Sequence, residues 1–343
     1  MTSRERVIAA LDFKPVDKAP LEYHPCSRGF FEHGEPFRRL LKELPGDFED
    51  FSDGEIPVIP KDAIDENGSY HALETDAWGV EWESRIFAML GHPKHQPLAD
   101  WSALASFHCP PHSLADPRVF ANYKAHVEKM KETQFVKAGW VGFFEKMHAL
   151  RPFEDVLMDV YEDETEINYL ADMLVDYQIE EMQYLIDAGV DAIQFGDDFG
   201  TNDTMLLSPE VWRSFFKPRY RRLVQKAKEN GKKVFFHSCG YVMPIFADLK
   251  EIGVDAVWPQ QTAYNLHDLA AYLKKLGLAC ALHIDRAEIM THGTPQDVVC
   301  ATRKTAQAFD IMNGGAFFYV ETDNGFPFKN IEALLHTIAE YRR

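Results

Sequence analysis

The sequence has 343 residues with ordinary globular composition, 46% hydrophobic and 26% charged. Its formal net charge of -18, from 54 acidic and 36 basic residues, argues against nucleic acid and anionic membranes as partners. The five cysteines are odd in number and widely spaced, no apolar run reaches 18 residues, and the N-terminus is charged. We therefore expect a cytoplasmic protein without a disulfide framework, a membrane span or a secretion signal.

The first predicted elements are a helix that Thr2 or Ser3 can cap and a short strand at Leu21–Tyr23. Residues 24–134 contain many Pro, Gly, His and aromatic residues and show no clean period. We interpret this stretch as one unit of a barrel with long insertions, because the loops above a barrel carry its specificity.

From residue 135 onward, apolar strand-like runs alternate with amphipathic helical stretches. The spacing favours a parallel sheet. With the first strand, these units nearly fill an eight-stranded barrel, so we predict one (β/α)8 TIM-barrel domain over residues 1–343. An open doubly wound sheet is the alternative, but no glycine-rich phosphate loop follows an early strand. The predicted strands are Phe135–Val141, Ala192–Phe195, Val234–Phe236, Ala256–Trp258, Leu278–Ile284 and Ala316–Val320, and the predicted helices are 165–188, 208–230, 241–252, 265–276, 294–310 and 329–342.

Polar side chains follow each predicted strand at its carboxyl end. In a barrel these ends converge on one face, so residues that are distant in sequence become neighbours. The candidates are His24 and Arg28, Asp197 and Asp198, His237 and Cys239, Gln260, His283 and Asp285, and Glu321 and Asp323.

His237 and Cys239 form the most informative pair, because residues two apart in a strand point to the same side. Imidazole and thiolate are good zinc ligands, and a catalytic zinc needs three protein ligands and one open position. Glu321, Asp323 or His283 could supply the third ligand. The alternative interpretation is a hydrogen-bonded core histidine beside a small buried cysteine.

Other candidates concern the substrate. Asp197 or Asp198 could orient a substrate or move a proton, but either could instead prepare the start of the following helix. Arg28 could bind a carboxylate. Trp78 could form the wall of a pocket for a planar ligand, or it could belong to the core.

The sequence resembles the uroporphyrinogen decarboxylase superfamily nearly from end to end. The resemblance rests on SRERVIAALDFKPVDKAP, DAWGVEWESRIF, GHPKHQPLADW, GDDFGTNDTMLLSPEVWRSFFKPRYRRL, KVFFHSCG, HGTPQDV and GFPFKNIEAL. The resemblance implies a barrel of the uroporphyrinogen decarboxylase type. True decarboxylases of this superfamily need no metal and carry the motif Arg-Gln-Ala-Gly-Arg, which is missing here. Phe51-Ser52-Asp53 is similar to the segment with the decarboxylase aspartate, but it lies in an acidic stretch that would repel an octa-acid.

The sequence is more similar to the branch of corrinoid-linked methyltransferases and demethylases, whose coenzyme M enzymes bind zinc through His-x-Cys and a later Cys. His237 and Cys239 match the pair, but no Cys follows Cys300, and Glu321 lies near the place of the third ligand. The departure makes coenzyme M a poor candidate for the acceptor.

The resemblance implies zinc-dependent methyl transfer between a small ether, thioether or amine and a corrinoid carried by a partner protein. His237, Cys239 and Glu321 would hold the metal, while Asp198, His283 and Asp285 would orient the substrate or move a proton. His24, Arg28, Trp78, Asp197 and Gln260 would contact the substrate. Metal-free decarboxylation and a non-catalytic corrinoid- or ligand-binding barrel are the alternatives, and a homodimer is possible for barrels of this kind.

Overall fold

The structure is a computed structural model that describes residues 1–343, with residue 25 described by its backbone only. Its contacts divide the chain into two compact units, each built from separated segments. The first unit comprises Met1–Val58, Glu128–Lys137 and Val254–Arg343, and the second comprises Ile59–Val127 and Ala138–Gly253. The single domain over residues 1–343 stays a prediction.

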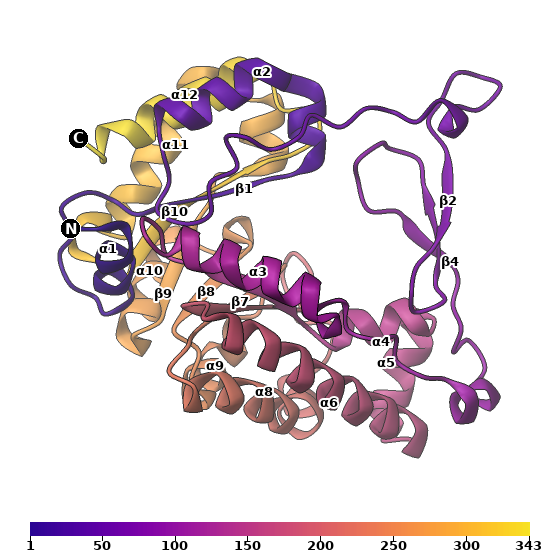
Figure 1. Cartoon of the computed structure of the whole chain (residues 1–343). Helices are drawn as coiled ribbons and strands as arrows, with labels where there is room; N and C mark the ends of the chain where they lie inside the picture. The colour runs from indigo at the N-terminus through magenta and orange to yellow at the C-terminus, as the bar shows by residue number, and fades with distance from the viewer. The chain divides into compact units, whose positions relative to one another are not determined.

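The first unit contains four strands in the order β1-β10-β9-β8, and the printed pairs are parallel. Figure 1 shows α2, α11 and α12 close to one another, in agreement with their contacts. Thr2 caps the first helix through a capping box with Glu5, which confirms the predicted start. The elements are α1 (Ser3–Leu11), β1 (Leu21–Pro25), α2 (Ser27–Glu43), β8 (Ala256–Pro259), α10 (Leu266–Leu276), β9 (Ala279–Leu282), α11 (Pro295–Ala308), β10 (Ala316–Thr322) and α12 (Phe328–Glu340).

The second unit contains the strand order β5-β6-β7 and a separate antiparallel sheet in the order β2-β3-β4. Helices α6 and α8 pack on each other, as do α8 and α9 (Figure 1). The elements are β2 (Ala72–Thr75), β3 (Glu81–Ser84), β4 (His92–His95), α4 (Phe144–Leu150), α5 (Phe153–Glu162), α6 (Thr165–Ala188), β6 (Ala192–Gly196), α7 (Pro209–Val211), a π-helical turn (Trp212–Phe216), α8 (Lys217–Glu229), β7 (Lys233–Ser238) and α9 (Phe246–Ile252). The boundary between the two units crosses α3 (Pro117–Met130) and β5 (Lys137–Val141).

The predicted strand–helix alternation is confirmed. All seven predicted strands are present, with ends that differ by two residues or fewer, and every predicted helical stretch contains a helix. Helices α2 and α3, the short helices α4 and α5 and the sheet β2-β3-β4 were not predicted. The small sheet has no fully buried residue, so its sequence lacks the strict apolar alternation on which strand prediction depends.

A cluster of buried aromatic rings fills the second unit next to the ends of β5 and β6. Phe144 and Phe199 stack at 4.9 Å, Phe143 contacts Tyr220 at 4.9 Å, and Phe216 contacts Phe199 at 5.0 Å between ring centroids. All five rings are fully buried. Each such ring stabilises the fold by about 1.5–3 kcal/mol through burial. The cluster therefore stabilises the region from which the loops after β5 and β6 begin.

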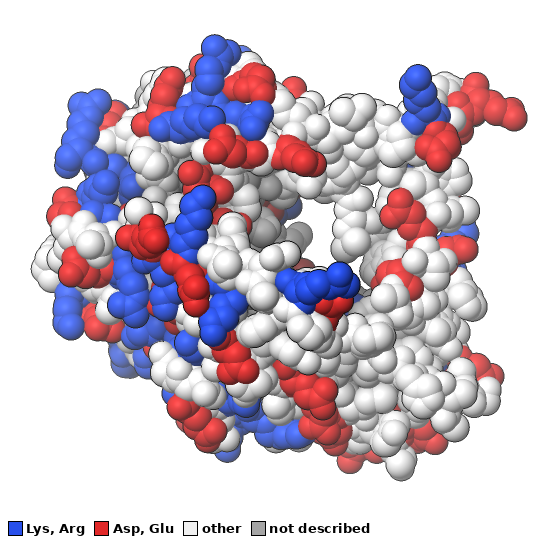
Figure 2. Space-filling model, in the orientation of Figure 1, with Lys and Arg blue, Asp and Glu red and all other residues white. Residues whose placement is uncertain are grey.

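The surface carries both signs of charge. Figure 2 shows Lys and Arg interspersed with Asp and Glu over the face that it draws. On α8, Arg219 and Arg222 pair with acidic residues of α6, and Arg221 pairs with Glu251. The basic residues of α8 are thus largely neutralised locally. Among the described residues, no helix is both long and apolar enough to cross a bilayer.

Asp47 connects both ends of the chain inside the first unit. Its carboxylate accepts hydrogen bonds from Arg6, from Arg342 at 2.6 Å and from the backbone N–H of Leu21 at 3.0 Å. Asp47, Arg6 and Arg342 are all nearly inaccessible to solvent. Removal of the carboxylate would leave the buried Arg342 guanidinium without its acidic partner and the buried Arg6 guanidinium with Asp17 alone.

We therefore expect Asp47→Ala to lower the free energy of unfolding by about 3–5 kcal/mol, the usual cost of breaking a buried ion pair. Urea unfolding followed by circular dichroism measures the change. Asp53→Ala is the matched control, because the Lys42–Asp53 pair is exposed and should leave the unfolding midpoint unchanged. Equal midpoints for the two variants would contradict this role of Asp47.

Candidate active site

Three potential metal ligands meet where β6 and β7 end. His237 Nε2 lies 3.4 Å from Cys239 Sγ and 3.4 Å from Asp198 Oδ1. One ligand atom from each of the three side chains lies within 4.8 Å of the others. His237 is buried, whereas Asp198 and Cys239 are partly exposed, so the group opens toward solvent on one side.

Close contact between two strand-end loops creates this arrangement. The backbone N–H of Cys239 donates to Asp198 Oδ1 at 2.7 Å, and the N–H of Phe199 donates to Ser238 Oγ at 3.0 Å. Gly240 has a φ of 72°, and a Cβ atom there would lie 2.2 Å from the carbonyl carbon of Gly200. Only glycine fits such a backbone contact. The two loops are therefore held in one register.

The three side chains fit a metal ion by both chemistry and spacing. Imidazole nitrogen, thiolate sulfur and carboxylate oxygen are the ligand types that zinc accepts. Ligand atoms at ordinary zinc distances in a tetrahedral site are roughly 3.3–3.6 Å apart. The two 3.4 Å separations around His237 agree with this spacing. Three protein ligands would leave one position for a substrate.

Asp197 is buried, and its carboxylate binds the backbone of the segment that follows β5. Its carboxylate accepts the backbone N–H groups of Phe143, Phe144 and Glu145 at 2.8, 3.0 and 2.7 Å, and also the hydroxyl of Tyr220. Asp197 has no exposed surface. Burial raises the pKa of this carboxyl group, while the four donors act in the opposite direction. Direct contact between Asp197 and a substrate stays a prediction.

Trp140 and Glu145 connect the Asp198–His237–Cys239 group with a cavity. The ring of Trp140 lies 5.7 Å from that of His237, and its Nε1 is 3.5 Å from Glu145 Oε2. A Cβ atom on Gly196 would lie 2.4 Å from the Trp140 ring, so the absence of a side chain at Gly196 leaves room for the indole. Burial, followed by the charges of Asp197 and Asp198, raises the pKa of Glu145. Glu145 therefore favours its protonated form more than an exposed glutamate does.

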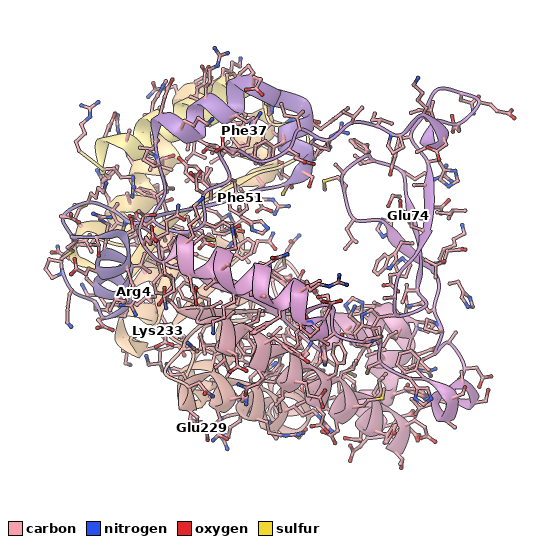
Figure 3. All side chains as sticks on the ribbon, in the orientation of Figure 1. Arg4, Phe37, Phe51, Glu74, Glu229 and Lys233 are labelled. Carbon is pink, nitrogen blue, oxygen red and sulfur yellow. The ribbon has the colours of Figure 1, made fainter. Side chains whose placement is uncertain are left out.

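The cavity has a volume of about 880 Å³ and belongs entirely to the second unit. Its wall includes Trp78, which was predicted to contact the substrate. The ammonium of Lys146 lies over the Trp78 ring at 4.7 Å, and Tyr177 meets that ring edge-on at 4.9 Å. Glu74 on β2, labelled in Figure 3, also lines the cavity.

The predicted third ligand, Glu321, belongs to the first unit. Its carboxylate binds Arg286 at 2.8 Å and accepts a long contact of 3.7 Å from the Cys26 thiol. Arg286 also pairs with Asp323 at 2.7 Å. Burial raises the pKa of Glu321. Its role as a metal ligand stays a prediction, and the third group that the structure brings to His237 and Cys239 is Asp198.

Other predicted catalytic residues of the first unit have local partners. His283 is buried, with Nε2 3.0 Å from the carbonyl oxygen of Pro259. Asp285 accepts the backbone N–H groups of Ala287 and Glu288 and so caps the π-helical turn Arg286–His292. These contacts account for both residues as structural elements, and their catalytic roles stay predictions.

The structure also describes the surroundings of three residues of the first unit that were predicted to contact the substrate. His24 is exposed and stacks on Tyr319 at 5.9 Å between ring centroids. Arg28 pairs with Glu32 at 2.8 Å. Gln260 precedes the short helix Gln261–Ala263 after β8. Substrate contact by these three residues stays a prediction.

Four residues around the cavity were not predicted from the sequence: Trp140, Glu145, Lys146 and Gln178. Trp140 lies within a predicted strand. Glu145 follows that strand by four residues, so its position near a strand end was the one available signal for it. Gln178 lies in the middle of α6, where no local pattern indicates function.

The parallel strand–helix units define a protein of the α/β-barrel class, with a group of potential metal ligands at two strand ends. The family model for uroporphyrinogen decarboxylase (URO-D) matches residues 123–341. The chain therefore belongs to the uroporphyrinogen decarboxylase family, as predicted.

Two relatives are methyltransferases of Methanosarcina mazei. The chain is 23% identical to Methylcobamide:CoM methyltransferase MtbA over 175 residues, which is 50% of this chain and 49% of that protein. The match thus spans about half the length of this relative. A solved structure, described as a methyltransferase, covers 100% of both chains with a TM-score of 0.67 at 16% identity. This likeness confirms the predicted barrel fold class.

The contacts of Asp197 predict its energetic role. Asp197→Asn should lower the free energy of unfolding by roughly 1–3 kcal/mol, because an amide nitrogen cannot accept the N–H groups at the start of α4. Tyr220→Phe removes a single donor and should cost about 1 kcal/mol. Urea unfolding of the two variants and the parent measures both changes. An Asp197→Asn variant as stable as the parent would show that these hydrogen bonds do not hold α4.

Proposed function

We propose that the protein is a zinc-dependent methyltransferase that moves a methyl group between a small methylated substrate and a corrinoid on a partner protein. The observation that carries this proposal is the meeting of Asp198, His237 and Cys239 at two strand ends. The relative MtbA is named as a methylcobamide-dependent enzyme, which supports a corrinoid partner. The family model supports an enzyme rather than a binding protein.

His237, Cys239 and Asp198 would hold the zinc ion in this proposal. Zinc bound there would supply Lewis-acid chemistry, which lowers the proton affinity of a thiol or polarises the atom that carries the methyl group. Asp198 has a second task, because its Oδ1 atom accepts the N–H of Cys239 and so orients the thiol. Glu321, predicted from its strand end, is the competing third ligand.

The cavity residues of the second unit would position the substrate beside this group. The ring of Trp140 lies 5.7 Å from that of His237, and Glu145 Oε2 lies 3.5 Å from the indole nitrogen of Trp140. A protonated Glu145 can donate a hydrogen bond or a proton at the atom that loses its methyl group. Asp197 would act through Glu145, since it fixes the backbone N–H of that residue.

Decarboxylation of a tetrapyrrole, the activity that names the family, is less compatible with this cavity. Even with Glu145 protonated, Glu74, Asp76 and Glu181 line it against a single Lys146, so a substrate with many carboxylates would meet like charges. Asp53, which resembles the decarboxylase aspartate in sequence, is exposed and pairs with Lys42.

Metal analysis of protein purified without a histidine tag tests the proposed ligands. We expect one zinc ion per chain in the parent and no stoichiometric zinc in His237→Ala or Cys239→Ala, because each variant loses a ligand. Asp198→Asn should weaken zinc binding, whereas Glu321→Gln should leave it intact. The reverse order for the two carboxylates would establish Glu321 as the third ligand, and a metal-free parent would remove zinc from the proposal.

A methyl-transfer assay tests the activity. The absorbance of cobalamin reports transfer when methylcobalamin reacts with a small thiol, or when reduced cobalamin reacts with a methyl ether, thioether or amine. Cys239→Ser should lower the rate roughly 100-fold or more, since even changes next to a metal ligand cost 10–100-fold. Cys300→Ser is the matched control, because Cys300 is an exposed residue of α11. No transfer above the uncatalysed rate with any of these pairs would contradict the proposed function.

A further inference from the structure

One buried hydrogen-bond acceptor in the lining of the second unit's cavity has no partner in the protein. Gln178 is buried, and its Oε1 atom has no hydrogen-bond partner, while its Nε2 atom donates to the carbonyl oxygen of Gly142 at 2.5 Å. Because this donor bond fixes the amide, the oxygen cannot exchange places with the nitrogen without losing the bond to Gly142. A buried acceptor without a partner costs free energy, which a ligand with an N–H group would recover.

The charged side chains of the cavity also favour a ligand that carries an N–H group and a positive charge. Four carboxyl groups and one ammonium belong to its lining. The carboxylate of Asp76 is used by the protein itself, since it accepts the backbone N–H of Trp78 and Val80 and the indole N–H of Trp82. Even with Glu145 protonated, Glu74 and Glu181 exceed Lys146 in number, so the cavity favours a positively charged ligand over an anion.

Aromatic faces complete the recognition of a cation. Lys146 already places its ammonium 4.7 Å from the centre of the Trp78 ring, which shows that this wall accepts a positive charge on its π face. Trp140 is the comparable ring at the end of the cavity near His237, and 45% of this residue is exposed. A cation on Trp140 would lie beside Glu145 and near the proposed metal ligands.

We infer that the cavity binds a small methylated ammonium ion that retains an N–H group, such as trimethylammonium, between Trp140, Glu145 and Gln178. The N–H donates to Gln178 Oε1, the methyl groups contact the indole, and the carboxylates of Glu74 and Glu181 favour the positive charge. This inference rests on the proposed function only in that the ion would be the methyl donor: one methyl group would pass to the reduced corrinoid, and dimethylamine would leave with the N–H hydrogen. It narrows the substrate class from ethers, thioethers and amines to amines.

Binding of three probes of similar size to the parent protein tests the inference directly, followed by isothermal calorimetry or by tryptophan fluorescence. Trimethylammonium carries charge and an N–H group, tetramethylammonium carries charge alone, and tert-butanol is neutral. We expect trimethylammonium to bind at least about 10-fold more tightly than tert-butanol, because cation–π and charge interactions are lost with the neutral probe. Tetramethylammonium should have an intermediate affinity.

Variants locate the bound ion. Gln178→Leu should weaken trimethylammonium binding roughly 5–10-fold and abolish its advantage over tetramethylammonium. Trp140→Leu should weaken both cations. Gln183→Leu is the matched control, since Gln183 lies on the same helix and outside the cavity lining. Thermal unfolding of each variant shows whether the fold is kept, and the probe comparison in the parent needs no variant.

The outcomes separate this inference from the proposed function. Equal affinity for tert-butanol and the two cations, or preference for a carboxylate such as benzoate, would overturn the ammonium site while methyl transfer from other donors could still be measured. Tight, Gln178-dependent binding of trimethylammonium without any methyl transfer would support the site and contradict the methyltransferase proposal.

Discussion

The hydrogen bond from the backbone N–H of Cys239 to Asp198 Oδ1, 2.7 Å long, joins the loops that follow β6 and β7. It places a thiol, a carboxylate and the His237 imidazole within reach of one another. Gly240 makes the bond possible, because any side chain there would collide with Gly200. The motifs Gly-Asp-Asp and His-Ser-Cys-Gly therefore encode one contact between neighbouring loops, and the proposed chemistry depends on that contact.

The adjacent residues Asp197 and Asp198 have different contacts. Asp197 points into the protein and holds three backbone N–H groups, whereas Asp198 lies with His237 and Cys239. Neighbouring residues of an extended chain point in opposite directions, and Asp197 and Asp198 directly follow β6. As a result, the first turn of α4 is fixed by one carboxylate while the other remains available at the site. Glu145, which also lines the cavity, is thereby placed near the potential metal ligands.

The sequence was sufficient for the strands and for the His237–Cys239 pair, because apolar runs and strand ends are local signals. It was not sufficient for Asp198 as the third member, since a backbone hydrogen bond between two loops leaves no pattern in composition or spacing. The prediction of Glu321 followed chain position, whereas its actual contacts are with Arg286 and Cys26. Gln178 could not be predicted from the sequence at all. It matters because its buried Oε1 atom has no hydrogen-bond partner, and only the three-dimensional structure shows this.

X-ray absorption spectroscopy of the zinc-loaded parent protein tests the central claim most directly, since it counts the atoms around the metal. We expect a single sulfur at about 2.3 Å from the metal, together with nitrogen and oxygen neighbours at roughly 2.0–2.1 Å. In Cys239→Ser the sulfur contribution should disappear. A metal surrounded only by oxygen and nitrogen in the parent, or a sulfur contribution that persists in Cys239→Ser, would show that this pair of strand ends does not form the metal site.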